Sequence, residues 1–282
     1  MLTRVGEIEI WRILDWQGLF FRPERLFPNA PEDVTKIVEA LAPGSVDPET
    51  GRLILPVLAY LLKTPEHTIL VDTGVGDDKT TNKLPFWDHI TGTGLPAALV
   101  EAGVHPDDID YVLFTHLHID HVGWNTRLRD GQYVPTFANA TYLFPAGDQE
   151  ECMNGDPDKL EESIAPIIAA GMAKWMANDD TIGDNITLLP TPGHTLGHVS
   201  ILLRSGGQEA VITGDAIHST AQCQNPEWQF AFDTNATMAV TSRLRLLETC
   251  AERGLTVIGC HFTLPSIGRI EPDGDVFRWV ES

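Results

Sequence analysis

The heptapeptide at positions 115–121 reads Thr-His-Leu-His-Ile-Asp-His, and no other stretch says as much about this 282-residue chain. Three imidazoles and one carboxylate fall within six positions, directly after the apolar run 111–114. Such a run is typical of a buried strand, so it delivers the cluster at the mouth of a sheet. His and Asp are ligands of zinc and similar divalent ions. We therefore expect a metal site formed by His116, His118, Asp120 and His121.

The spacing of these residues favours an extended backbone. If the chain stays extended past Thr115, side chains 116, 118 and 120 point to one side, because side chains alternate along a strand. On a helix, positions 116 and 118 would face apart and could not share one ion.

Four other apolar segments also end in His or Asp beside a small or turn-forming residue. The residues at these ends are Asp72, His194, Asp215 and His261. One such ending is weak evidence, because strands often stop at Asp or Gly. Five in one chain are hard to explain unless the ends converge, and we expect them to supply the remaining ligands.

The chain resembles the metallo-β-lactamase fold superfamily of hydrolases from about residue 55 to 261, through its His-x-His-x-Asp-His signature. The resemblance implies an α/β fold, a four-layer αβ/βα sandwich with a two-metal site at one edge of the paired sheets. It assigns the first ion to His116, His118 and His194, and the second to Asp120, His121 and His261, with Asp215 as the bridge. Asp72 matches the Asp-Thr-Gly motif and would orient a ligand imidazole. His198 would brace the turn that carries His194.

Within the superfamily the sequence is most similar to N-acyl-homoserine lactonases and to the methyl parathion hydrolase group. The second match runs through segments 214–218 and 224–228. Homoserine lactonases usually have Tyr three residues after the bridging Asp, whereas this chain has His218. We expect His218 to donate to the substrate or leaving group; the alternative is a buried histidine bonded to backbone.

Other classes fit less well. True β-lactamases of this fold lack a bridging Asp at the position of Asp215, and diiron flavoproteins carry Glu at the position of His118. The serine-hydrolase motif Gly-x-Ser-x-Gly is absent. With 19 Lys+Arg against 40 Asp+Glu, the formal charge is −21, so nucleic acid is not expected as a partner.

Composition and length indicate one soluble domain over 1–282. No linker or repeat interrupts the chain, and the 43% hydrophobic fraction is ample for a core. A secretory leader and a membrane-length apolar run are not seen, which predicts a cytoplasmic protein without a membrane partner. The four cysteines show no CxxC spacing and need not pair. Relatives of this kind are often dimers, which leaves a homodimer open.

The expected chemistry follows from two close divalent ions. A hydroxide bridging them would be the nucleophile, and one ion would polarise the carbonyl oxygen. Asp120 could pass the proton to the leaving alkoxide. Zinc suits the nitrogen-rich ligand set, but manganese, cobalt or iron would also fit.

A hydrophobic substrate is suggested by aromatic residues near the ligands. We name as candidates for the pocket wall Phe86, Trp87, Trp124, Trp228 and Phe262. An apolar cleft favours an acyl chain or aromatic ring. The alternative is that these rings belong to the core. The Gly- and Thr-rich segment 76–94 has the composition of a mobile loop that caps the pocket.

These inferences predict a dinuclear metal-dependent hydrolase acting on a small-molecule lactone or carboxylic ester. A phosphotriesterase or arylesterase is the alternative within the class. An iron-dependent oxidoreductase on the same fold and a non-catalytic metal-binding protein are the alternatives outside it.

Hydrophobic patterns predict the elements. Strands are expected at 7–14, 53–62, 68–72, 111–115, 141–144, 186–189, 198–203, 210–213, 255–259, 268–271 and 276–280. Helices are expected at 95–102, 157–177 and 235–253.

Overall fold

The computed structural model describes residues 1–282, which divide into two compact units. Unit 1 consists of residues 1–16 and 57–177, and unit 2 consists of residues 17–56 and 178–282. Each unit is discontinuous because two long strands, β2 (Ile8–Leu19) and β3 (Ile54–Lys63), begin in one unit and end in the other.

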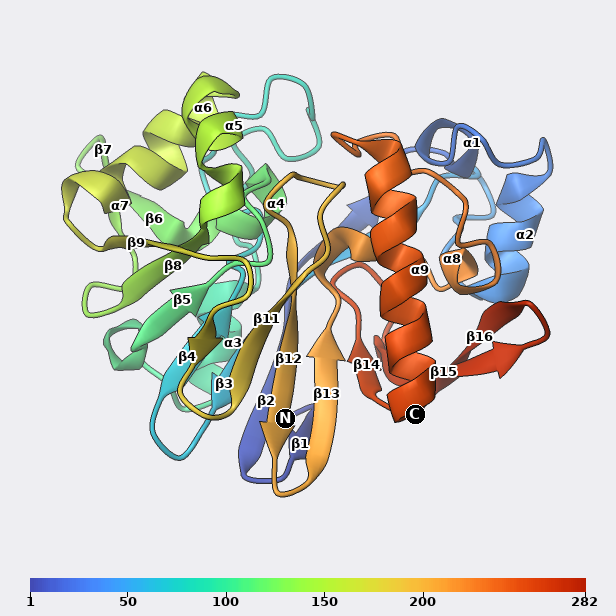
Figure 1. Ribbon diagram of the computed structural model, residues 1–282. Helices are drawn as coiled ribbons and strands as arrows, with labels where there is room; N and C mark the ends of the chain where they lie inside the picture. Colours follow the sequence, from blue (N-terminus) through green and yellow to red (C-terminus); the bar gives the residue numbers. More distant parts are fainter. The chain divides into compact units, whose positions relative to one another are not determined.

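The first sheet has seven strands in the order β1-β2-β3-β4-β5-β8-β9 (Figure 1). Besides β2 and β3 it contains β1 (Thr3–Val5), β4 (Thr68–Val71), β5 (Tyr111–Leu113), β8 (Thr141–Pro145) and β9 (Ala173–Met176). The last four strands run parallel. Because parallel strands end at the same edge of a sheet, the segments after β4 and β5 emerge side by side.

The remaining elements of unit 1 are short. A two-stranded hairpin is formed by β6 (Thr126–Arg129) and β7 (Gln132–Pro135). The helices are α3 (Leu95–Glu101), α4 (Ile119–Val122), α5 (Gln149–Asn154), α6 (Pro157–Lys159) and α7 (Ala165–Ala169).

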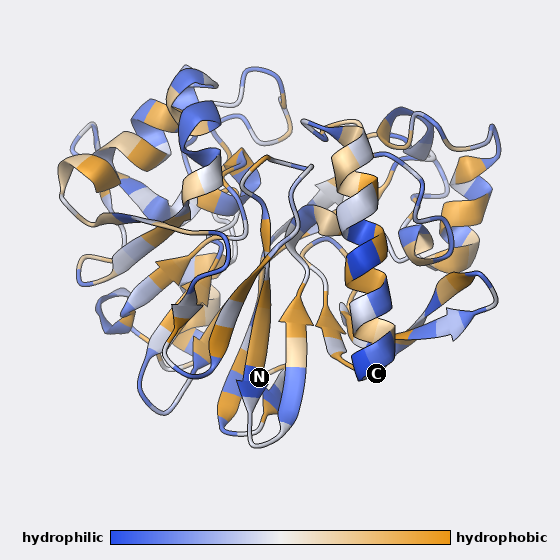
Figure 2. Cartoon of the chain, viewed as in Figure 1, coloured by the Kyte–Doolittle hydropathy of each residue, from blue (hydrophilic) through white to orange (hydrophobic).

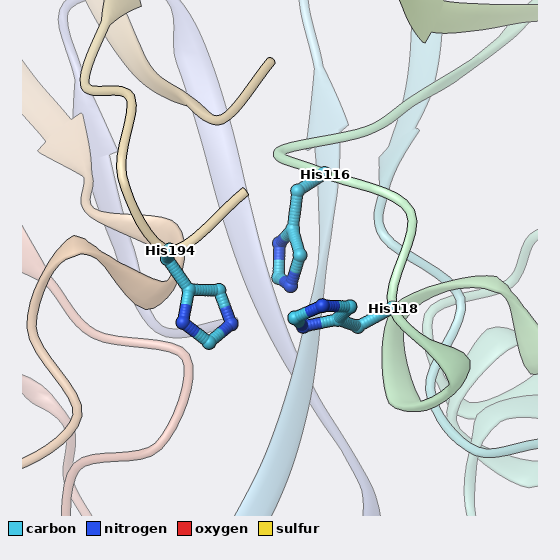
Figure 3. A group of neighbouring side chains, drawn as sticks. All are labelled: His116, His118 and His194. Atoms are coloured by element: carbon cyan, nitrogen blue, oxygen red, sulfur yellow. The ribbon is translucent and has the colours of Figure 1, made fainter. Parts of the chain in front are cut away.

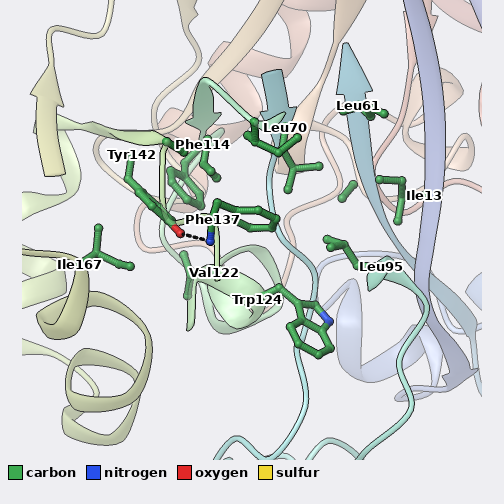
Figure 4. Packing of buried hydrophobic residues seen from close by; sticks show 14 of the residues in the cluster. Ile13, Leu61, Leu70, Leu95, Phe114, Val122, Trp124, Phe137, Tyr142 and Ile167 are labelled. Atoms are coloured by element: carbon green, nitrogen blue, oxygen red, sulfur yellow. Dashed lines mark hydrogen bonds between the residues drawn. The ribbon is translucent and has the colours of Figure 1, made fainter. Parts of the chain in front are cut away.

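A continuous apolar core supports the ends of β4 and β5. Figure 4 shows Phe114 beside Tyr142 and Phe137, with Val122 of α4 and Trp124 in the same cluster. The Tyr142 hydroxyl accepts a hydrogen bond from the Phe137 amide at 3.1 Å, which satisfies a polar atom inside the cluster. The residues that flank the heptapeptide are therefore fixed by packing.

The second sheet has seven strands in the order β10 to β16. They are β10 (Thr181–Ile182), β11 (Ile186–Pro190), β12 (Val199–Ser205), β13 (Gln208–Ile212), β14 (Thr256–Ile258), β15 (Ile267–Asp273) and β16 (Val276–Glu281). Only β13 and β14 pair in parallel, joined through the long helix α9 (Ala236–Arg253). The short helices of unit 2 are α1 (Pro23–Leu26), α2 (Val34–Leu41) and α8 (Ala221–Gln224).

Helix α9 covers its sheet through one apolar face. Leu246, Leu247 and Cys250 pack with Val211 and Val257 in one buried cluster. Figure 2 shows strands that are largely apolar, beside a helix that carries both hydrophilic and apolar residues. The side chain of Asn235 caps the helix start by accepting the Met238 amide at 3.0 Å, and Gly254, with φ of 60°, ends the helix in the left-handed region.

The expected strands are confirmed within a few residues, and so are the helices at 95–102 and 235–253. The helix predicted at 157–177 is wrong in its second half. The helical part consists of α6, a π-helical segment (Leu160–Ile164) and α7. Residues 173–176 instead form β9, because Tyr142 to Pro145 of β8 offer a free edge for pairing. Helices α1, α2, α5 and α8, strands β1 and β10, and the β6–β7 hairpin were not expected.

No helix is both long enough and apolar enough to cross a membrane. The cytoplasmic location stays a prediction. All four cysteines are buried, and no disulfide joins them.

Candidate metal centre

Unit 1 carries four of the expected ligands on the connection after β5. The backbone is extended at His118, with φ of −75° and ψ of 162°, and then turns into α4. The expectation of extended chain through residue 120 is therefore wrong from residue 119 onward. This turn brings the three imidazoles together. The centroid of the His116 ring lies 4.1 Å from that of His121 and 4.6 Å from that of His118. Figure 3 shows His116 and His118 facing each other.

Asp72 fixes both ends of this connection. It follows β4 with φ of 58°, a left-handed conformation that Asp tolerates better than most residues. Its carboxylate accepts the Thr115 amide at 2.9 Å and the Thr115 hydroxyl at 2.8 Å, and it accepts Nδ1–H of His121 at 2.8 Å. Because Nδ1 of His121 donates to Asp72, Nε2 carries the lone pair that a metal requires.

A second buried carboxylate, Asp15 on β2, braces the same region and was not identified from the sequence. It accepts the amides of Val75 at 2.8 Å and Leu95 at 3.0 Å, and the Trp124 indole at 3.1 Å. Burial raises the pKa of Asp15 to about 6, although these hydrogen bonds work in the opposite direction. Asp15 thus links the loop after Asp72 to the segment that follows His121.

Unit 2 gathers three histidines around one carboxylate. Asp215 lies in the turn after β13, where Oδ2 is 3.2 Å from Nε2 of both His194 and His218, and Oδ1 is 3.2 Å from Nε2 of His261. His194 follows β11, and Figure 3 shows its ring extending from that connection. His261 follows β14. Strands β11, β13 and β14 run in the same direction and end at the same edge of the sheet, which brings three of the five predicted endings together.

Each of two histidines is oriented by an acceptor at Nδ1. His194 donates to Asp233 at 3.0 Å, and His261 donates to the Pro56 carbonyl at 2.8 Å. Burial lowers the pKa of His194, but Asp215 and Asp233 outweigh it and raise this pKa to about 9. Burial raises the pKa of Asp233, yet the His194 contact holds it below its ordinary value. Asp233 was not expected, because no local motif marks it.

His198 and His218 behave differently from each other. His198 is fully buried; its Nε2 accepts the Asp215 amide at 2.8 Å, and its Nδ1 lies 2.8 Å from the Thr191 hydroxyl. His198 therefore holds the backbone of Asp215. His218 stacks on Phe230 with ring centroids 3.5 Å apart. Burial lowers the pKa of His218 to about 4, so the imidazole is neutral near pH 7.

A buried cation, Arg243 on α9, holds the segment that follows Asp215. It donates to the carbonyls of Ala216 at 2.9 Å, Pro226 at 2.8 Å and Trp228 at 2.6 Å. Burial lowers the pKa of Arg243 to about 10, which still leaves it charged. Gln222 shares the Trp228 carbonyl at 3.1 Å, so the connection is fixed at several points.

The donor chemistry of both units suits divalent metal ions. The side chains are imidazoles and carboxylates, and His121, His194 and His261 are oriented so that Nε2 can bind an ion. In unit 2 the ligand atoms of His194, Asp215 and His218 all lie within 4.8 Å of one another. The negative field that raises the pKa of His194 also attracts a cation, and metal binding would displace the extra proton.

The aromatic candidates for the pocket wall are mostly buried. Phe262 packs on Trp279 with centroids 5.1 Å apart, and Trp228 packs on Phe27 at 5.6 Å. Trp87 is also buried, Trp124 is nearly so, and Phe86 is half-buried. A role in substrate binding stays a prediction for these residues.

Segment 76–94 is hydrogen-bonded to the rest of unit 1. Lys79 is buried and donates to the Thr126 hydroxyl at 2.6 Å, and Thr80 donates its amide and hydroxyl to Glu162 at 2.8 and 2.6 Å. The Tyr133 hydroxyl donates to the Asp78 carbonyl at 2.5 Å. The composition suggested mobility, whereas these contacts anchor the segment.

Comparison with known proteins identifies the family. The model of the metallo-beta-lactamase superfamily matches residues 53–253, which is most of the chain. The chain belongs to the metallo-beta-lactamase superfamily. The matched range includes the heptapeptide, His194 and Asp215. The protein is therefore a metal-dependent hydrolase.

Relatives and solved structures agree with this assignment. An N-acyl homoserine lactonase from Bacillus sp is 29% identical over 224 residues, covering 76% of this chain and 82% of the relative. The crystal structure of hydrolase AbOPH in the beta lactamase superfamily is 26% identical, with a TM-score of 0.83 over 99% of this chain and 96% of that one. AidC, a dizinc quorum-quenching lactonase, is 22% identical, with a TM-score of 0.81 over 99% and 96% of the two chains. The expected metallo-β-lactamase fold is confirmed.

Proposed function

We propose that the two clusters form one dinuclear centre in a single domain spanning residues 1–282, and that the enzyme hydrolyses a hydrophobic lactone or carboxylic ester. His116, His118 and His194 would hold the first ion. Asp120, His121 and His261 would hold the second, and Asp215 would contribute its carboxylate to both. Zinc is the expected metal in both positions.

The observation that carries this proposal is the arrangement around Asp215. Three imidazoles meet one carboxylate at 3.2 Å, and both carboxylate oxygens are used. A carboxylate that faces ligands on both oxygens is suited to bridge two cations. The second cluster, in unit 1, offers the complementary donors, three imidazoles and a carboxylate within six positions.

The ions, when bound, supply a nucleophilic hydroxide near neutral pH and polarise the substrate carbonyl. The protein's part is to place the donors and to move one proton. Asp120 is suited to the second task, because its side chain is 13% exposed whereas that of His121 is 1% exposed. Asp120 takes up the proton released on attack and returns it to the leaving alkoxide.

The substrate class is supported by relatives. The relative from Bacillus sp is named as an N-acyl homoserine lactonase. In unit 2 the connections that carry the ligands also expose large apolar residues: Leu196 follows His194, and Leu264 follows His261.

A substrate panel tests the proposal. The zinc-loaded enzyme is assayed with N-acyl homoserine lactones, aryl esters and a phosphotriester, and kcat/KM is compared for each. We expect the highest kcat/KM on a lactone or carboxylic ester. A preference for the phosphotriester would make that activity the main one, and the absence of any hydrolysis by enzyme with two bound ions would contradict the proposal.

A further inference from the structure

His218 has an environment that a hydrogen-bonding role does not explain. The residue is 4% exposed, and neither ring nitrogen makes a hydrogen bond of acceptable geometry. Buried polar atoms normally have partners, and leaving one without a partner costs about 1–3 kcal/mol. A buried imidazole therefore requires another kind of partner at its nitrogen atoms.

The distances around Asp215 match those of a metal coordination shell. Two adjacent ligand atoms bound to one zinc ion at ordinary bond lengths lie about 3 Å apart, and a five-coordinate shell accommodates five such donors. Nε2 of His194 and Nε2 of His218 each lie 3.2 Å from Oδ2 of Asp215. These two distances share one oxygen, and the donor atoms of the three residues all lie within 4.8 Å of one another.

The ring of His218 is held in the orientation that this face requires. Phe230 stacks on it with an interplanar angle of 15°, and the His218 amide donates to Gln222 at 2.8 Å. Arg243 and Gln222 in turn fix the Trp228 carbonyl in the same connection. A ligand whose orientation is set before binding loses little entropy when the ion arrives.

We infer that His218 is a ligand to the ion that His194 and Asp215 hold, rather than a hydrogen-bond donor to the substrate. The inference rests on the proposed function, because it requires the centre to bind metal. It replaces the role expected from sequence, and it gives unit 2 three donors to a single ion, two imidazoles and one carboxylate.

Metal affinity distinguishes the two roles. The affinity of His218→Gln for zinc and cobalt is measured by competition with a chromophoric chelator, and the cobalt absorption spectrum is recorded. Removing a group that only supports a ligand weakens binding about 10–100-fold, so loss of a ligand should exceed about 100-fold and change the spectrum. The matched control Phe230→Leu removes the stacking ring but keeps the imidazole, so it should lose no more than about 100-fold and keep the wild-type cobalt spectrum.

Unchanged metal affinity and an unchanged cobalt spectrum in His218→Gln, with a fall in kcat, would overturn the inference and restore the donor role. If the variant does not fold, nitrogen-15 NMR of zinc-loaded wild-type enzyme decides, because a metal-bound Nε2 carries no proton. A proton on Nε2 of His218 would overturn the inference. If His218 carries that proton but the wild-type protein binds two ions and hydrolyses lactones, the proposed function stands. A wild-type protein that binds no metal would overturn both the inference and the proposed function.

Discussion

The two units of the chain assemble their clusters of metal-binding side chains in opposite ways. In unit 1 the donors are neighbours in sequence, and one carboxylate, Asp72, holds both ends of the heptapeptide. In unit 2 the donors come from three strand ends and meet only because β11, β13 and β14 belong to one sheet. The donors of a local motif are held in place by contacts within the motif, whereas the positions of dispersed donors depend on the packing of the whole unit.

The contrast extends to the charged residues that brace each cluster. Unit 1 uses a buried anion, Asp15, which accepts three donors around the ligand loop. Unit 2 uses a buried cation, Arg243, which donates to three carbonyls after Asp215. We expect substitution of Arg243 to impair metal binding in unit 2 through packing.

The largest effect is expected from Asp215→Asn. The amide keeps the shape but removes the charge that three imidazoles face, so a loss in kcat/KM on the order of 10³-fold is expected if several kcal/mol of charge stabilisation are lost. Steady-state kinetics with the preferred ester or lactone measures it. Glu209→Gln, an exposed carboxylate elsewhere in unit 2, is the control and should retain full activity. Equal activity in both variants would remove Asp215 from the centre.

Arg243→Met tests the dependence of unit 2 on packing. The Ala216 and Pro226 carbonyls lose their donor inside the protein, and the Trp228 carbonyl keeps only Gln222, which should lower the free energy of unfolding by about 3 kcal/mol or more. Leu247→Ala, one turn along α9, should cost about 2–5 kcal/mol through a cavity but leave these carbonyls satisfied. Urea denaturation gives the stabilities. At matched stability, Arg243→Met should lose zinc to a chelator faster; identical rates would assign Arg243 a purely structural role.

Asp15 predicts a specific pH dependence of unit 1. Its folded pKa of about 6 lies above the ordinary value of 3.8 for this carboxyl, so the folded state binds the extra proton. Stability from this group is present below about pH 4 and is lost as the pH rises through about 6, a change of up to about 3 kcal/mol. Asp15→Asn removes the titration, so the stability of wild type relative to the variant should fall between pH 4 and 7 in urea denaturation. A constant difference would contradict the buried, protonated carboxyl.

The smallest effect is expected from substitution of the residues that orient the ligands. One such residue in each unit allows a direct comparison of the two units. Asp72→Asn and Asp233→Asn should each weaken zinc binding by about 10–100-fold. Asp72 should have the greater effect, because it also binds the amide and hydroxyl of Thr115, whereas Asp233 otherwise binds only the Phe230 amide at 3.0 Å. Chelator competition measures both affinities. The reverse order would show that the dispersed cluster is the more sensitive one.

How far the sequence could predict this molecule follows from the same contrast. The heptapeptide, Asp72 and the strand endings were recognisable because hydrophobic periodicity and ligand type are local properties. Asp233 contacts His194 across 39 positions, and Asp15 contacts Trp124 across 109, so no pattern in the chain signals either. The bend at residue 119 was missed because it depends on Val122 packing into the core. The helix expected at 157–177 failed because strand pairing at β9 outweighs local helical propensity.

The most direct test of the account is anomalous diffraction from crystals of the zinc-loaded enzyme. The account predicts two zinc peaks about 3.5–4 Å apart, as in other two-metal sites, with Asp215 between them and ligands from both units on the ions. A single zinc bound by one unit alone, or two ions bound far from each other, would contradict it.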